Sequence, residues 1–286
     1  MPDRTAAPFP YSPEQKGSHR MPWYWILLII SAIVGPFEAM HALNKARRRR
    51  EEQLKQQRLS AGDASAESGK TAGLPGALNA YIWDLDGTLL DSYGSIVSSL
   101  AQIAEEYRTG DSYDDIMKAV KQGSVSAYLR EVSEKTGADY RELYDRYREI
   151  SHGKTDEITL IPGAAETLKA LQDAGAEHFV YTHRGKSTAP ILDRLDLTRF
   201  FTEIVTFENG FQPKPSGEGV EYLTDKYGLD RNATAYVGDR TLDVYCAKDA
   251  GVRAILYLPD GSCVTPTGRE DRIIRQLEEL IPQDGR

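Results

Sequence analysis

Apolar runs of strand length alternate with amphipathic stretches over the C-terminal two thirds of the chain. The apolar runs are rich in aromatic and β-branched residues and cover residues 80–84, 177–182, 203–207, 233–239 and 253–258. Stretches with the apolar spacing of a helix occupy residues 164–175, 187–197, 218–228 and 241–251. This alternation is typical of a parallel sheet with helices on its faces. We therefore predict an α/β fold built on a Rossmann-like parallel sheet.

One interval, residues 93–159, interrupts the alternation. It has no strand pattern, and its helical stretches are residues 94–108, 113–123, 124–137 and 139–150. We interpret it as an all-helical cap that is inserted after the first strand, so that residues 78–92 and 160–286 form the α/β core. A lid over the core is a natural use for such an insert. We expect Asp91 to cap the first helix of the cap.

The N-terminal segment has a different pattern. Residues 1–20 are rich in proline and polar residues without apolar periodicity, which predicts a disordered tail. The next stretch, from Met21 to Phe37, contains seventeen residues without a charge. This length lies at the short end of the roughly 17–25 residues that cross a bilayer. We therefore predict a single transmembrane anchor at residues 21–40.

The flanks of this stretch favour an anchor. Aromatic residues at 23–25 suit a membrane interface, and residues 41–59 form a predicted basic helix with six Lys and Arg between positions 45 and 55. This charge bias predicts that the α/β domain lies in the cytoplasm, and a flexible linker at residues 60–77 joins it to the basic helix. The first alternative is a cleaved secretory signal, but no small-x-small cleavage site follows the apolar run. The other alternative, an apolar helix packed on protein, would leave the chain soluble in the cytoplasm.

The distribution of charge restricts the partners. The net charge is −8, but residues 1–77 carry 11 Lys and Arg against 7 Asp and Glu, whereas residues 78–286 carry 24 against 36. The resulting charges are +4 and −12. A body this acidic argues against a nucleic-acid backbone as the main partner, since such binding needs clustered cations. The two cysteines, Cys246 and Cys263, form no CxxC motif and are expected to be free thiols.

Polar residues follow the carboxyl ends of the predicted strands, where ligands bind in open parallel sheets. They are Asp84, Asp86, Thr182, His183, Arg184, Asp239 and Asp243, and the loop after the third strand adds Lys214. Crowded carboxylates repel one another unless a cation lies among them, and Mg²⁺ prefers a few carboxylates together with water and phosphate oxygens. This combination of acids and a lysine suits phosphoryl transfer, in which catalysis is mostly positioning and charge neutralisation.

The two acids that follow the first predicted strand, Asp84 and Asp86, can take different roles. A carboxylate can attack phosphorus to give an aspartyl phosphate. An acid two positions later, as Asp86 is from Asp84, can protonate the leaving oxygen and later deprotonate water. Gly87 permits a positive φ and close backbone approach, and Thr88 supplies a hydroxyl and an amide, so both residues are candidates for binding the phosphate.

The chain resembles the haloacid dehalogenase superfamily of phosphohydrolases. In this resemblance DLDGT (84–88) is the first motif, Thr182 the second, Lys214 the third and GDRTLD (238–243) the fourth, over about residues 79–286. A helical insert directly after the first motif is similar to the phosphoglycolate phosphatase and β-phosphoglucomutase branch. The resemblance implies that the chain is a phosphohydrolase of this fold.

The resemblance also implies roles. Asp84 would be the nucleophile and Asp86 the general acid/base, and the presence of the second acid argues against a dehalogenase. Thr182 would hydrogen-bond the transferring phosphoryl group, and Lys214 would neutralise the charge of the phosphate and the nucleophile.

The implied cofactor is Mg²⁺. Asp84, the backbone carbonyl of Asp86 and Asp239 would hold the ion, and Asp243 would orient the lysine or a metal-bound water. His183 and Arg184 are candidates for binding the substrate's phosphate or leaving group, although an arginine at this strand end could equally pair with a neighbouring acid.

Three functions remain open at this point. The first is Mg²⁺-dependent hydrolysis of a small phosphorylated metabolite, a phosphomonoester, under a lid that excludes water. The second is a mutase that moves phosphate within a sugar by the same chemistry. The third is a membrane-tethered regulatory or scaffold module without turnover, against which the intact set of charged residues counts.

Overall fold

The computed structural model describes residues 78–282, and its core is a six-stranded sheet in the order β5-β4-β1-β6-β7-β8. All neighbouring strands in this sheet are parallel, which confirms the predicted α/β fold. The strands are β1 (Ala80–Trp83), β4 (Glu177–Tyr181), β5 (Phe201–Val205), β6 (Thr234–Gly238), β7 (Arg253–Tyr257) and β8 (Arg272–Ile274). The pattern of the sequence does not predict β8, because this strand has only three residues and no period of its own.

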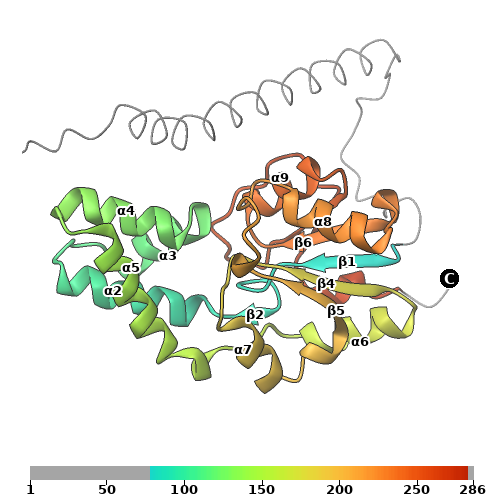
Figure 1. Cartoon of the computed structure of the whole chain (residues 1–286), viewed down its shortest axis with the longest axis horizontal. Coiled ribbons are helices and arrows are strands. Elements are labelled where there is room, and N and C mark those ends of the chain that lie inside the picture. Colours follow the sequence, from blue (N-terminus) through green and yellow to red (C-terminus); the bar gives the residue numbers. More distant parts are fainter. Residues whose placement is uncertain (1–77, 283–286) are drawn as a thin grey trace, which may run out of the picture. The chain divides into compact units, whose positions relative to one another are not determined.

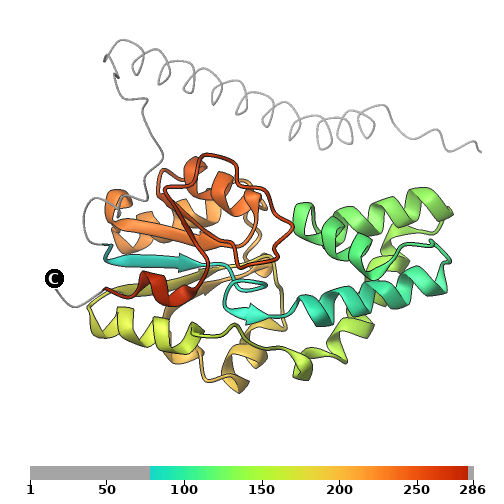
Figure 2. The same cartoon turned by 180° about the vertical axis from the view of Figure 1, so that it is seen from behind.

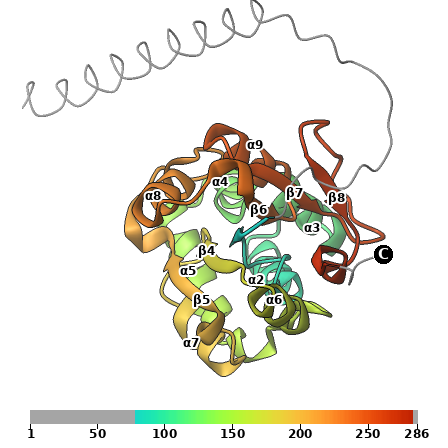
Figure 3. The ribbon, with the colours of Figure 1, turned by 90° about the vertical axis from the view of Figure 1, so that its right-hand side faces the viewer.

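Helices cover both faces of the sheet (Figures 1 and 3). On one face lie α8 (Glu218–Tyr227) and α9 (Thr241–Asp249), and on the other lie α6 (Ala164–Asp173) and α7 (Thr188–Arg194). Side chains alternate along a strand, so β1 sends Tyr81 and Trp83 into one layer and Ala80 and Ile82 into the other. Burial on both faces explains why this strand is a continuous apolar run in the sequence.

The inserted segment consists mainly of four helices, as predicted (Figure 1). These are α2 (Tyr93–Glu106), α3 (Tyr113–Gln122), α4 (Val125–Thr136) and α5 (Tyr140–His152). Ser112, Ser124 and Asp139 cap the last three through side-chain oxygens that accept backbone N–H bonds. The helices enclose an apolar cluster of their own around buried Leu100 and Leu129, separate from the two layers of the core.

A short two-stranded antiparallel sheet joins the cap to the core. It pairs β2 (Leu90–Asp91) with β3 (Thr159–Leu160), where the sequence showed no strand pattern. Asp91 is exposed in β2, and the residue before α2 is Ser92, which makes no side-chain capping bond. The expectation that Asp91 caps α2 is therefore wrong, because β pairing takes the chain one residue past it.

The chain after β7 runs outward before it returns to the sheet. Residues 258–271 form a long loop that reaches toward the cap (Figure 2). There the Gln122 side-chain amide at the end of α3 donates a 3.3 Å hydrogen bond to the Cys263 carbonyl. Both Cys246 and Cys263 are free thiols, as predicted.

The N-terminal predictions fall outside the described residues. They concern the tail at 1–20, the anchor at 21–40, the basic helix at 41–59 and the linker at 60–77. Within residues 78–282, no helix is both long and apolar enough to cross a membrane.

A buried histidine links β4 to β1 and α6. Trp83 Nε1 donates to His178 Nδ1 at 3.1 Å, so the proton of the neutral ring is on Nε2, which donates to the Leu168 carbonyl at 3.0 Å. Both ring nitrogens are thus used by one tautomer. Burial lowers the pKa of His178 to about 4 from its ordinary 6.5.

This pKa predicts an acid-sensitive core. The unfolded chain takes up a proton on His178 below about pH 6.5 and the folded chain does not, so stability should fall by about 3 kcal/mol as the pH drops from 6.5 to 4. Urea unfolding at pH 7, 5.5 and 4.5 measures the loss. His178→Gln, which cannot titrate, should be less stable at pH 7 but should lose less between pH 7 and 4.5. An equal pH dependence in both proteins would contradict the prediction.

Candidate active site

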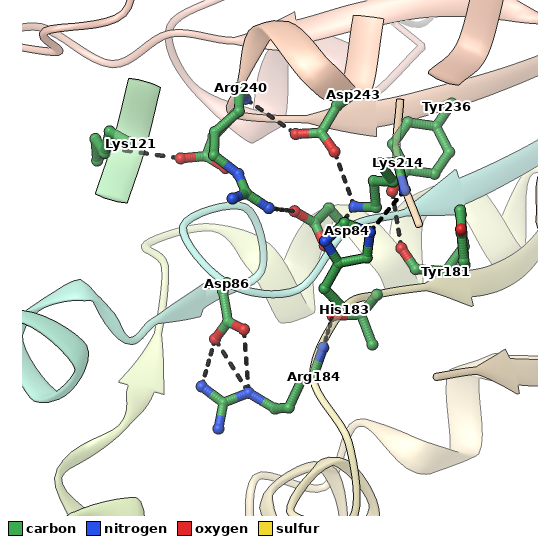
Figure 4. A network of polar contacts seen from close by, with 12 residues as sticks. Asp84, Asp86, Lys121, Tyr181, His183, Arg184, Lys214, Tyr236, Arg240 and Asp243 are labelled. Carbon is green, nitrogen blue, oxygen red and sulfur yellow. Dashed lines mark hydrogen bonds and ion pairs between the residues drawn. The ribbon is translucent and has the colours of Figure 1, made fainter. Parts of the chain in front are cut away.

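The predicted site residues meet at the carboxyl edge of the sheet (Figure 4). Asp84 follows β1, Thr182 follows β4 and Asp239 follows β6, and all three are buried. Their strands are neighbours in the sheet, which is why residues so far apart in sequence lie together. The loop after β5 adds Lys214.

Lys214 is held between two acids. Its Nζ lies 2.9 Å from Asp84 Oδ1 and 2.8 Å from Asp243 Oδ1, and its side chain has no solvent exposure. The rings of Tyr181 and Tyr236 lie 5.5 and 5.1 Å from the same nitrogen. Burial by itself would lower the pKa of Lys214, but the two carboxylates raise it above its ordinary value, so the ammonium stays charged.

His183 supports the lysine loop through its ring. Its Nε2 accepts a 2.8 Å hydrogen bond from the backbone N–H of Lys214. Burial, helped by the charges of Lys214 and Arg240, lowers the pKa of His183 to about 3, which keeps the ring neutral and able to accept. His183, which the sequence offered as a substrate-binding residue, therefore uses its ring to bind the protein backbone. Thr182 Oγ1 likewise accepts from the Arg184 N–H at 3.1 Å.

Arg184 pairs with the predicted general acid/base. Its Nε lies 3.1 Å from Asp86 Oδ1, and its terminal Nη2 lies 2.5 Å from the same oxygen. Of the two uses that the sequence left open for this arginine, pairing with an acid is the one seen. Burial would raise the pKa of Asp86, but the guanidinium outweighs burial and holds it below its usual range, so Asp86 is ionised.

The acids at this edge fit a divalent cation. Carboxylate oxygens of Asp84, Asp239 and Asp243 lie within 4.8 Å of one another. Asp84 Oδ2 and both oxygens of Asp239 are buried without a hydrogen bond from any described residue. Burial raises the pKa of Asp239 to about 7. Unpaired buried carboxylate oxygens are costly, and a hard cation such as Mg²⁺ would satisfy them.

Asp243 differs from the other two acids. Its Oδ1 accepts from Lys214, and its Oδ2 accepts a 3.0 Å bond from the backbone N–H of Arg240 at the start of α9. Both oxygens already have donors, so Asp84 and Asp239 are the better ligands. This geometry suits the predicted task of orienting the lysine.

Two further basic residues, to which the patterns in the sequence assign no role, also enter the site. Arg240 Nη2 lies 3.7 Å from Asp84 Oδ2, and Arg240 Nε lies 4.0 Å from Asp239 Oδ1. Lys121 reaches in from the cap, with its Nζ 3.6 Å from Asp239 Oδ2 (Figure 4). Arg240 stood within the fourth motif, which was a usable signal, whereas no pattern in the sequence pointed to Lys121.

Comparisons with known proteins point to one family. Residues 81–257 match the family of haloacid dehalogenase-like hydrolases. A phosphoglycolate phosphatase from Agrobacterium fabrum is 34% identical over 61% of the chain and 78% of that enzyme. The pyrophosphatase PpaX of Bacillus velezensis is 26% identical, with coverages of 71% and 95%. The fold is similar to that of a subfamily IA hydrolase from Geobacter sulfurreducens, with a TM-score of 0.53, 23% identity and coverages of 72% and 98%.

Gly87 allows the first motif to turn within the site. Its φ is +79°, and a Cβ at this position would lie 2.2 Å from Tyr93 Cε2 and 2.5 Å from Asp239 Oδ2. Both the backbone conformation and the space therefore require glycine.

We expect Gly87→Ala to destabilise the chain by about 1–3 kcal/mol and to displace Asp239. Denaturant unfolding measures the first effect. Gly94→Ala is the matched control, because Gly94 lies in α2 and an added Cβ meets nothing within 4 Å, so it should be neutral or slightly stabilising. Equal stability of the two variants would show that position 87 does not require glycine.

Proposed function

The chain belongs to the haloacid dehalogenase-like hydrolases, in the branch with a helical cap that includes phosphoglycolate phosphatase, and from this premise we propose that it is a Mg²⁺-dependent phosphatase acting on a small phosphomonoester. The observation that carries the proposal is the buried ammonium of Lys214 between Asp84 and Asp243, beside carboxylate oxygens that no described residue hydrogen-bonds. Such a site binds an anion and a divalent cation together.

In the first half of the reaction, a carboxylate oxygen of Asp84 attacks the phosphorus atom and the bond to the ester oxygen breaks. Asp86 gives a proton to the departing oxygen, and Lys214 balances the negative charge that gathers beside Asp84. The products are the free alcohol and an aspartyl phosphate. Mg²⁺, held by Asp84 and Asp239, would shield the charge of the phosphoryl oxygens.

In the second half, Asp86 takes a proton from water, whose oxygen attacks the phosphorus and releases inorganic phosphate from Asp84. The Arg184 pair holds Asp86 in the ionised form that this step requires. Protonating the leaving group requires the opposite state, so Asp86 must take up a proton and loosen its contact with Arg184 in each cycle.

The substrate proposal comes from the relatives. Phosphoglycolate phosphatase and pyrophosphatase are the named activities of the two enzymes compared above. We therefore propose a small phosphorylated metabolite such as phosphoglycolate as the substrate.

The purified full chain should release phosphate from 2-phosphoglycolate, pyrophosphate or p-nitrophenyl phosphate only when Mg²⁺ is present. Asp84→Asn should lower the rate at least about a thousandfold, because the amide cannot act as the nucleophile. Asp91→Asn, an exposed acid of the same segment, should leave the rate unchanged. Phosphate release that survives Asp84→Asn or excess chelator would refute the mechanism.

We also propose that residues 21–40 anchor the chain in the cell membrane with the catalytic domain in the cytoplasm. The uncharged stretch and the basic residues that follow it support this proposal.

The full chain should then stay in the membrane pellet after carbonate extraction. Ile29→Arg with Ile30→Arg should move it to the supernatant, because each arginine at a helix centre costs about 2.5–3.5 kcal/mol on insertion. Release of the unaltered chain into the supernatant would reject the anchor and favour a soluble cytoplasmic protein.

A further inference from the structure

The cap brings one positive charge close to the three acids Asp84, Asp239 and Asp243. Lys121 lies in the last turn of α3, with its Nζ 3.6 Å from Asp239 Oδ2 and 4.4 Å from the centre of the Tyr93 ring. Its side chain is only 15% exposed. The aromatic ring and the carboxylate together hold the ammonium in a place that is largely withdrawn from water.

This ion pair is incompletely formed. Among the described residues, the Lys121 ammonium donates no hydrogen bond, and neither oxygen of Asp239 accepts one. By contrast, Lys135 in the same cap contacts Asp111 at 2.9 Å. At 3.6 Å the two charges still attract each other, but they lack the stronger hydrogen-bonded contact. Both groups are nevertheless largely desolvated, which is unfavourable for a charge.

We propose that Lys121 is a resident counter-charge for Asp239, which a divalent cation displaces when it binds. The inference rests on the cation site proposed above and goes beyond it by linking that site to the cap. A divalent cation held by Asp239 would lie beside the carboxylate whose Oδ2 Lys121 faces, and two positive charges beside one carboxylate repel each other. Lys214 and Arg240 belong to the core, so Lys121 is the cation among these that can leave with the cap.

The displacement has a structural consequence. The contacts that tie the end of α3 to the core in the described residues include the Lys121 ion pair and the single bond from Gln122 to Cys263. Loss of the first weakens this end of the cap–core junction. Because linkage is reciprocal, a cation that releases Lys121 favours detachment of α3, and attachment of α3 disfavours the cation. A divalent cation and the attachment of α3 therefore compete for Asp239.

Calorimetric titration of the full chain with Mg²⁺, without substrate, tests the exchange. Lys121→Met removes the competing charge and keeps an unbranched side chain beside Tyr93, so Mg²⁺ should bind about tenfold more tightly. Lys121→Arg keeps the charge and should bind as the unaltered chain does. Lys118→Met is the matched control, since it removes an exposed lysine from the same helix and should change the affinity less than twofold.

Hydrogen exchange of the α3 amides gives a second measurement. Mg²⁺ should speed exchange at the end of α3 and near Cys263 in the unaltered chain, and Lys121→Met should show the faster exchange already without Mg²⁺. Equal Mg²⁺ affinity in Lys121→Met and the unaltered chain would overturn this inference while leaving the cation site in place. If neither the unaltered chain nor any variant, Asp239→Asn included, binds Mg²⁺, both this inference and the proposed cation site are overturned.

Discussion

The contact on which the rest of this site depends is the buried ammonium of Lys214 between Asp84 and Asp243. Two carboxylates at the end of a buried sheet would be too costly to desolvate if no cation joined them. The lysine comes from the loop after β5, and the acids come from the end of β1 and the start of α9. The three groups therefore meet only when the parallel sheet has formed, so assembly of the site depends on folding of the core.

The other charges of the site also face partners of opposite sign. Arg184 neutralises Asp86, Arg240 lies near both Asp84 and Asp239, and Lys121 faces Asp239. What is left unsatisfied is specific: one oxygen of Asp84 and both oxygens of Asp239 have no hydrogen-bond donor among the described residues. These oxygens could therefore hold a divalent cation beside the nucleophile, and such a cation would favour binding of a phosphoryl dianion.

The cap can act on this site because it is a separately packed body. It has its own apolar cluster and joins the core through the short β2–β3 pair, so its position can change without exposing the layers that hold the sheet together. Tyr93 and Lys121 bring its aromatic and basic side chains to Gly87 and Asp239. A cap that carries one charge into an otherwise core-built site links its own position to what that site has bound.

The sequence by itself determined the parallel α/β core, the helical insert and the edge where chemistry gathers, because strand period, helix period and the acids at strand ends are local patterns. It also marked Asp84, Asp86, Lys214 and Asp239 through their motifs. Only the tertiary structure decided how these residues are paired. That Arg184 faces Asp86, 98 positions away, and that Lys121 meets Asp239 depends on strand register, side-chain direction and the placement of the cap. No periodicity within one segment encodes contacts of that kind, since each is set by elements that meet only after folding.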